Sequence, residues 1–271
     1  MTRRARVDAE LVRRGLARSR QQAAELIGAG RVSIDGIPAA KPATAITMDA
    51  RLVVVTEERT WVSRGAHKLN GALDAFAISV EQRRCLDAGA STGGFTEVLL
   101  DRGAREVVSA DVGYGQLAWS LRSDPRVTVM ERTNVRTLTA GDVGGPVDLV
   151  VADLSFISLS TVLPALTACA SADADIVPMV KPQFEVGKAR VGPGGVVSDP
   201  ALRAESVLTV AHRAAELDWL TVDVTASPLP GPSGNVEYFL HLRSRTDHPG
   251  NYLEGDALER AVARAVSEGP Q

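Results

Sequence analysis

The chain has little of several features that would assign it to a particular class of protein. Its 271 residues include only two cysteines and four histidines. Two cysteines are too few for a disulfide framework, and the histidines show no spacing typical of metal ligands. We therefore expect a reduced, cytoplasmic protein that holds no metal ion.

Long hydrophobic runs are also missing. No apolar stretch approaches the ~20 residues of a transmembrane helix, and the first residues lack the apolar core of a signal peptide. We therefore expect no association with a membrane. The composition of the whole chain, with 45% hydrophobic and 23% charged residues, is typical of a globular protein. The length allows one large domain and one small domain.

Charge is distributed unevenly along the sequence. Residues 1–41 contain nine basic and four acidic residues and so carry +5, whereas the whole chain has a formal net charge of −3. The rest of the chain must therefore carry −8. Residues 1–41 thus form a basic head and the rest of the chain an acidic body. This distribution of charge predicts that the head binds a polyanion.

Residues 1–58 are predicted to form a separate small domain. Asp8 stands where it could cap a first helix, and Ser19 with Gln22 is a capping-box pattern for a second helix. The pair Asp35-Gly36 then predicts a tight hairpin. The domain is expected to consist of two helices followed by this hairpin.

This order of elements, with its basic residues, resembles the S4 RNA-binding domain. The resemblance implies that the basic head contacts RNA phosphates. The side chains expected to make these contacts are Arg4, Arg6, Arg14, Arg18, Arg20 and Lys41.

Beyond a linker of residues 59–67, anchored by Trp61 and Val62, short apolar strands alternate with helical patterns. Alternation of this kind predicts a doubly wound α/β domain over residues 68–271. A helix is expected to begin at Asp199-Pro200, and an amphipathic tail helix to cover the domain. The seven candidate strands are residues 85–87, 107–111, 127–131, 147–153, 175–181, 220–225 and 236–242.

The segment Cys85–Phe95, CLDAGASTGGF, is the most informative stretch of this domain. A strand end, a glycine loop and a helix start place backbone N–H groups at the carboxyl edge of the sheet. The glycine spacing is not that of a dinucleotide site, and it suits a cofactor without phosphates. S-adenosylmethionine is the candidate. Its predicted ligands are Asp87, Gly89, Ser91, Thr92, Gly93, Gly94 and Phe95, with Asp111 for the ribose and Asn134 for the adenine.

Four further residues at strand ends or at the domain start could carry chemistry. Lys68, Asp153, Lys181 and Glu237 match, in order and position, the Lys-Asp-Lys-Glu tetrad of ribose 2′-O-methyltransferases. With the S4-like head, the whole chain resembles the TlyA (haemolysin A) family of rRNA methyltransferases. The resemblance implies a Rossmann-like methyltransferase domain that methylates cytidine 2′-hydroxyls in 16S rRNA, 23S rRNA or both.

Within this reading, Lys181 is expected to be the base, although Lys68 stays open as an alternative. Arg64 and Lys188 are expected to contact RNA, with Lys188 on a glycine-rich segment, Glu185–Val197, that could close as a lid. Phe156 is either a stacking platform for an extruded nucleotide or a core residue. The expected partner is rRNA or a ribosomal subunit. The sequence leaves the oligomeric state open, and we favour a monomer.

Three other functions compete with this one. The first, an RNA-binding protein with an inactive methyltransferase domain, would require a broken tetrad or glycine loop, and the sequence has neither. The segment Asp153–Phe156 has the acidic-x-x-aromatic spacing of methyltransferases that modify an amino group of a base, although its middle positions differ from their proline-containing pattern. The haemolysin name suggests a membrane-lytic protein instead. The absence of a long apolar segment and the acidic body disfavour that reading.

Overall fold

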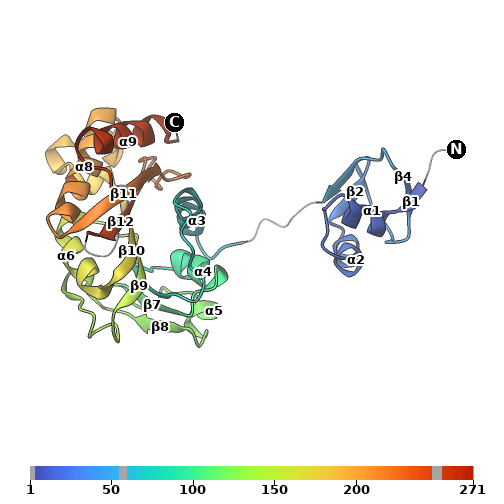
Figure 1. Cartoon of the computed structure of the whole chain (residues 1–271), viewed down its shortest axis with the longest axis horizontal. Helices are drawn as coiled ribbons and strands as arrows, with labels where there is room; N and C mark the ends of the chain where they lie inside the picture. Colours follow the sequence, from blue (N-terminus) through green and yellow to red (C-terminus); the bar gives the residue numbers. More distant parts are fainter. Residues whose placement is uncertain (1–3, 55–59, 246–251, 271) are drawn as a thin grey trace. The chain divides into compact units, whose positions relative to one another are not determined.

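The computed structural model describes residues 4–54, 60–245 and 252–270, in two compact units (Figure 1). The N-terminal unit is Met1–Thr60 and the C-terminal unit is Trp61–Gln271. The first residue of the linker predicted at 59–67 lies outside the described residues. From Trp61 onward the chain is part of the C-terminal unit, where Val62 N–H donates to Glu97 Oε2 at 2.8 Å.

The N-terminal unit consists of two helices and two small antiparallel sheets. One sheet pairs β1 with β4, and the other has the order β3-β2-β5. Its core includes Val7, Leu11, Ile27 and Ile46. The bounds are β1 Arg4–Arg6, α1 Val7–Arg13, α2 Arg20–Gly28, β2 Val32–Ile34, β3 Ile37–Pro38, β4 Ala45–Thr47 and β5 Leu52–Val54.

Local sequence signals account for most of these boundaries. Ser19 Oγ accepts from the Gln22 N–H at the start of α2, and Asp35 and Gly36 both have positive φ in the hairpin turn, as predicted. The prediction that Asp8 caps α1 was wrong. The cap position is Arg6, because β1 runs directly into the helix. Asp8 is therefore already helical, and its carboxylate is available to side chains.

The C-terminal unit contains the seven-stranded sheet that the alternating pattern predicted. Its order is β11-β12-β10-β9-β6-β7-β8, with β12 antiparallel to both neighbours and the ladder from β10 to β8 parallel. The strands are β6 Arg84–Ala88, β7 Glu106–Ala110, β8 Val127–Met130, β9 Val147–Ala152, β10 Ala170–Val180, β11 Trp219–Ala226 and β12 Tyr238–Ser244.

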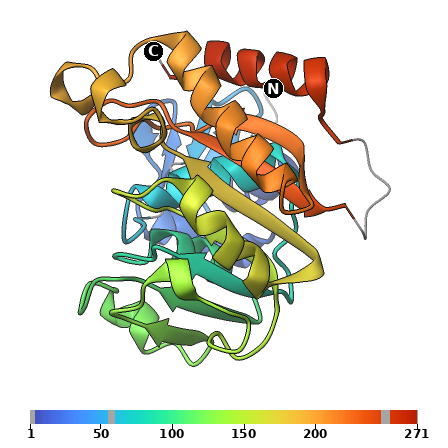
Figure 2. The same cartoon turned by 90° about the vertical axis from the view of Figure 1, so that its left-hand side faces the viewer.

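Helices cover both faces of this sheet. Neighbours in one strand, such as Cys85 and Leu86, belong to different core clusters, as expected when both faces are buried. Asp199 caps α8 as predicted, and α9 packs beside α8, with Leu258 and Val262 in the buried core (Figure 2). The helices are α3 Gly65–Ala75, α4 Gly94–Asp101, α5 Trp119–Arg122, α6 Leu159–Cys169, α7 Pro182–Glu185, α8 Pro200–Ala215 and α9 Gly255–Glu268.

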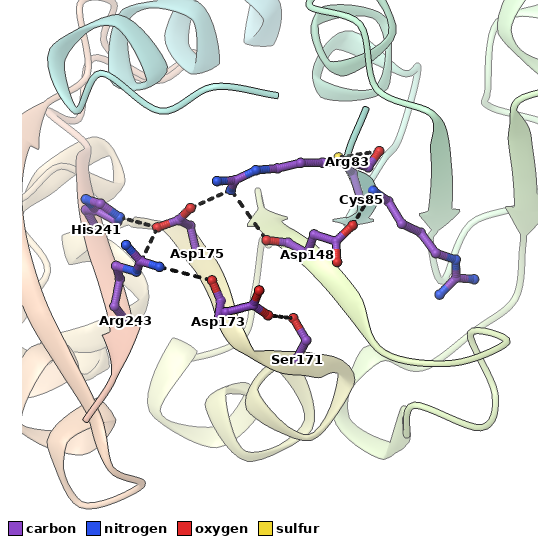
Figure 3. Close-up of polar contacts among 9 residues, drawn as sticks. Arg83, Cys85, Asp148, Ser171, Asp173, Asp175, His241 and Arg243 are labelled. Carbon is purple, nitrogen blue, oxygen red and sulfur yellow. Dashed lines mark hydrogen bonds and ion pairs between the residues drawn. The ribbon is translucent and has the colours of Figure 1, made fainter. Parts of the chain in front are cut away.

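An ionic network around the buried Asp175 crosses the sheet at the edge where its parallel strands begin (Figure 3). The Asp175 carboxylate of β10 contacts His241 Nε2 at 2.7 Å, Arg243 Nε at 3.4 Å and the guanidinium of Arg83. Burial alone would raise the pKa of the Asp175 carboxyl, but hydrogen bonds from His241 and Arg83 hold it below its ordinary value. The network joins β10, β12 and the residue preceding β6.

Candidate active site

The glycine loop after β6 brings the ends of two strands together. Gly89 has φ 91°, and a side chain there would collide with the backbone carbonyl of Asp153. A residue without Cβ is therefore required for the loop to pass the end of β9. The close approach places Asp153 beside the loop.

Asp111 braces the outer side of this loop. Its carboxylate accepts hydrogen bonds from Ser91 N–H at 2.8 Å and Gly113 N–H at 2.6 Å. Asn134 caps a short helical turn by accepting from Arg136 N–H at 3.1 Å. Asp111 and Asn134 both line a cavity of about 570 Å³, as do Gly89 and Ser91.

A second cavity, of about 310 Å³, adjoins the first and brings together the four residues of the tetrad. It shares Gly89, Ser91, Asp153 and Ser155 with the first cavity. The tetrad residues Lys68, Asp153, Lys181 and Glu237 lie in its wall, together with Arg64, Thr92, Gly94 and Phe95.

The tetrad forms two separate ion pairs. Lys68 Nζ lies 2.5 Å from Glu237 Oε2, and both side chains are buried. Lys181 Nζ lies 2.5 Å from Asp153 Oδ1 and donates to Ser155 Oγ at 2.9 Å. Each amine is thus held by its own carboxylate. Sequence order alone could not assign these partners.

Asp87 lies behind the loop and lines neither cavity. It is fully buried, and its Oδ2 accepts from Thr96 Oγ1 at 2.7 Å, which in turn contacts Ser109 Oγ. Burial raises the pKa of the Asp87 carboxyl to about 7. Its hydrogen bond joins the end of β6 to the first turn of α4, and the predicted contact of Asp87 with the cofactor stays a prediction.

Gly93 and Gly94 have different surroundings. Gly93 has φ 101°, and a side chain there would meet Leu117 and Leu121. A side chain at Gly94 would meet Ser63 Oγ, which lines the tetrad cavity. Gly93 is therefore required by the packing around α5, and Gly94 by the close approach of Ser63 and of the Ala66 backbone.

Phe156 is a surface residue, so the alternative that it belongs to the core was wrong. It is 91% exposed, its φ is 63°, and its ring lies 5.3 Å from that of Phe184. An exposed aromatic ring in the wall of the larger cavity, packed against the half-buried Phe184, suits stacking on a base.

The predicted RNA contacts of the C-terminal unit lie on its surface. Arg64 is exposed and lines the tetrad cavity. Lys188 is exposed in the turn Lys188–Arg190. The segment expected to act as a lid is tied at its far end, where Asn235 Nδ2 donates to the Gly195 carbonyl at 2.8 Å. Whether the segment moves stays a prediction.

The six basic residues of the N-terminal unit that were predicted to contact RNA fall into three groups. Arg4, Arg18 and Lys41 are exposed and form no ion pair with another described residue. Arg14 contacts Glu10 and donates to the carbonyls of Met48 and Ala50. Arg6 and Arg20 share Asp8.

Sequence reasoning missed Ser155 and Ser63 as parts of the site. Both stood next to residues that were predicted, Ser155 after Asp153-Leu154 and Ser63 before Arg64. A hydroxyl two residues beyond a carboxylate at a strand end was the available signal for Ser155. Within the described residues, no cluster of His, Cys, Asp and Glu is arranged to hold a metal ion, and no helix could cross a membrane.

Comparison with known proteins agrees with this architecture. Residues 61–244 match the FtsJ-like methyltransferase family, and residues 5–52 match the S4 domain. The chain is 76% identical, over the full length of both proteins, to the 16S/23S rRNA (cytidine-2′-O)-methyltransferase TlyA of Mycobacterium tuberculosis. It is 41% identical to YqxC of Bacillus subtilis, over 97% of this chain and 93% of that protein.

A solved structure from Streptococcus thermophilus that carries a hemolysin name is also similar. It aligns with a TM-score of 0.72 and 37% identity, and covers 99% of this chain and 98% of that one. The fold and the matched segments are those of an FtsJ-like methyltransferase joined to an S4 domain. The chain belongs to the TlyA family of rRNA methyltransferases, which confirms the resemblance drawn from its motifs.

Proposed function

We propose that this protein transfers a methyl group from S-adenosylmethionine to the 2′-hydroxyl of cytidine in 16S rRNA, 23S rRNA or both. The observation that carries the proposal is the convergence of Lys68, Asp153, Lys181 and Glu237 on one cavity beside the glycine loop. The name of the mycobacterial relative supplies the nucleoside and the rRNA.

The two adjoining cavities fit S-adenosylmethionine. Asp111 keeps carboxylate lone pairs available for ribose hydroxyls while it holds the loop. Asn134 lies in the same cavity wall, where it would contact the adenine. Gly94 lines the tetrad cavity, where the methionine portion would lie. When bound, the cofactor supplies an electrophilic methyl group.

The chain itself must orient the ribose hydroxyl and accept its proton. We assign the base to Lys181, because Asp153 and Ser155 hold its amine at the junction of the two cavities. The ammonium must first lose a proton before the amine can accept one from the hydroxyl. Lys68, held by Glu237, would position the ribose as a second cation. Phe156 would stack on the extruded cytosine.

We also propose that the protein acts in the cytoplasm as a monomer. Its substrate would be rRNA or a ribosomal subunit. The S4 domain would bind the RNA backbone. Among the described residues, the exposed basic side chains available for this purpose are Arg4, Arg6, Arg18, Arg20 and Lys41 of that unit and Arg64 and Lys188 of the C-terminal unit.

The test is to compare rRNA from cells with and without the gene by mass spectrometry of nucleosides, with the purified enzyme added back in vitro. We expect 2′-O-methylcytidine to disappear without the gene and to return with the enzyme and S-adenosylmethionine. A 2′-O-methyl group blocks alkaline cleavage of the adjacent phosphodiester. A methylated nucleotide that remains cleavable would instead identify a base methyltransferase. Unchanged rRNA together with lysis of erythrocytes would favour the haemolysin reading.

A further inference from the structure

Two arginines of the N-terminal unit converge on one buried carboxylate. Arg6, from β1, donates to Asp8 through Nε at 3.1 Å and Nη2 at 2.9 Å. Arg20, from the first turn of α2, donates through Nη2 to Asp8 Oδ2 at 2.9 Å. The Asp8 side chain is 5% exposed, whereas those of Arg6 and Arg20 are 51% and 59% exposed. The carboxylate is therefore inside and the two guanidinium groups are at the surface.

This arrangement holds two like charges close together. In isolation they would repel, and each long side chain would sample many rotamers. Asp8 offsets the repulsion and fixes both guanidinium groups through charge-assisted hydrogen bonds. Hydrogen bonds from Arg6 hold the pKa of the Asp8 carboxyl well below its usual range, so the carboxylate stays charged.

Both arginines keep donors that Asp8 does not use. A guanidinium has five N–H groups, and Asp8 accepts two from Arg6 and one from Arg20. The others lie on exposed side chains. Arg14 provides the contrast, because Glu10 and two backbone carbonyls use its donors and its side chain is only 24% exposed.

We propose that Asp8 is a positioning residue that fixes Arg6 and Arg20 as a single two-armed clamp for the phosphates of rRNA. The inference rests on the proposed role of this unit in RNA binding and goes one step further. A clamp fixed before binding loses less side-chain entropy when the phosphate arrives. Removing the negative charge of Asp8 should then weaken RNA binding, although charge alone predicts the opposite.

The experiment uses the full chain and unmethylated 16S and 23S rRNA transcribed in vitro, with binding measured at several salt concentrations. We expect Asp8→Asn to lower the affinity about five- to tenfold at low salt, as unpaired arginines lose their geometry. The matched control is Glu25→Gln, which removes one negative charge from an exposed position of α2. The control should bind within about twofold of wild type or more tightly.

A second readout separates positioning from a general loss of structure. In an Arg6→Gln/Arg20→Gln background, Asp8→Asn should cause no further loss of affinity, because the side chains through which it acts are absent. Binding of S-adenosylmethionine, which involves the other unit, should stay unchanged in every variant. Asp8→Asn affinity equal to or above that of wild type would overturn the inference, as would a full additional loss in the double-variant background.

If Asp8→Asn does not fold, a pair of charge-conserving variants decides the question. Arg20→Lys keeps the charge but loses the planar fork, and it should weaken binding several-fold. Arg51→Lys, at another exposed arginine of the same unit, should not. Equal affinities for these two variants would overturn the inference. Failure of wild type to bind rRNA would instead contradict the proposed function itself, which is a distinguishable result.

Discussion

Lys181 and Asp111 lie in adjoining cavities but have different polar partners. Lys181 Nζ is held by Asp153 and Ser155 in the tetrad cavity. Asp111 holds the glycine loop from the neighbouring cavity. If Lys181 acts on the ribose hydroxyl and Asp111 binds the cofactor, substitution of Lys181 should lower the rate of methyl transfer. Substitution of Asp111 should instead weaken the binding of the cofactor.

Lys181→Ala should lower the rate of methyl transfer by about 10²–10⁴-fold, the usual contribution of a general base. Its affinity for S-adenosylmethionine should stay near that of wild type, and raising the pH should not restore activity, because no amine remains. Asp111→Ala should do the reverse, weakening cofactor binding by about 1–3 kcal/mol with a smaller effect on the rate at saturation. Calorimetry and single-turnover assays measure the two quantities. A loss below about tenfold for Lys181→Ala would redirect the assignment to Lys68.

Individual side chains of the N-terminal unit were harder to predict. Arg6, Arg14 and Arg20 are equally basic in the sequence, yet Arg14 braces backbone carbonyls while the other two lie at the surface on Asp8. The difference depends on where β1 ends and on which loop lies across α1. Neither is visible in a local pattern.

At the scale of elements, the glycine loop between β6 and α4 is shaped by packing as well as by the cofactor. The strand, the loop and the helix were all predicted from Cys85–Phe95, because glycine spacing and apolar runs are local signals. Which glycine faces the cavity was not predictable, because it depends on α5 and on Ser63. A Cβ at Gly93, one of the predicted cofactor ligands, would point toward Leu117 and Leu121.

Gly93→Val should destabilise the C-terminal unit by about 1–3 kcal/mol, since valine disfavours φ 101° and would meet Leu117 and Leu121. Weaker cofactor binding should follow from displacement of the loop. Gly141→Ala is the control, because a Cβ there makes only an ordinary contact of 3.6 Å with Thr139. Thermal unfolding followed alongside cofactor binding tests this. Lost binding with unchanged stability would show instead that Gly93 lines the cofactor site.

At the scale of the whole molecule, the C-terminal unit is held at the edge opposite the site by the network around Asp175. The network connects β10, β12 and the residue preceding β6, which are far apart in sequence (Figure 3). All three tryptophans, Trp61, Trp119 and Trp219, belong to this unit, so their fluorescence reports its unfolding alone.

Asp175→Asn should lower the free energy of unfolding of this unit by about 2–3 kcal/mol near pH 7, because the buried His241 and the half-buried Arg83 and Arg243 lose their carboxylate. The folded-state pKa of Asp175 lies below its ordinary value, so its contribution is present above the unfolded pKa of ~3.9 and is lost as the pH falls through the folded pKa. The difference in the free energy of unfolding between wild type and Asp175→Asn should therefore have its largest value at pH 5 and above and shrink below about pH 4. Urea denaturation at several pH values measures it. The exposed Asp173→Asn serves as the control, and an equal loss there would contradict the assignment.

The sequence by itself determined the two segments of opposite charge, the alternation of strands and helices, the glycine loop and the residue types of the tetrad. These features depend on near neighbours in the chain or on composition. Tertiary structure alone decided that Lys68 pairs with Glu237, 169 residues away. It also decided that Asp153 holds Lys181 and that Asp87 is enclosed behind the loop. The physical reason is that strand order and register, set by the whole core, determine which side chains meet across the sheet.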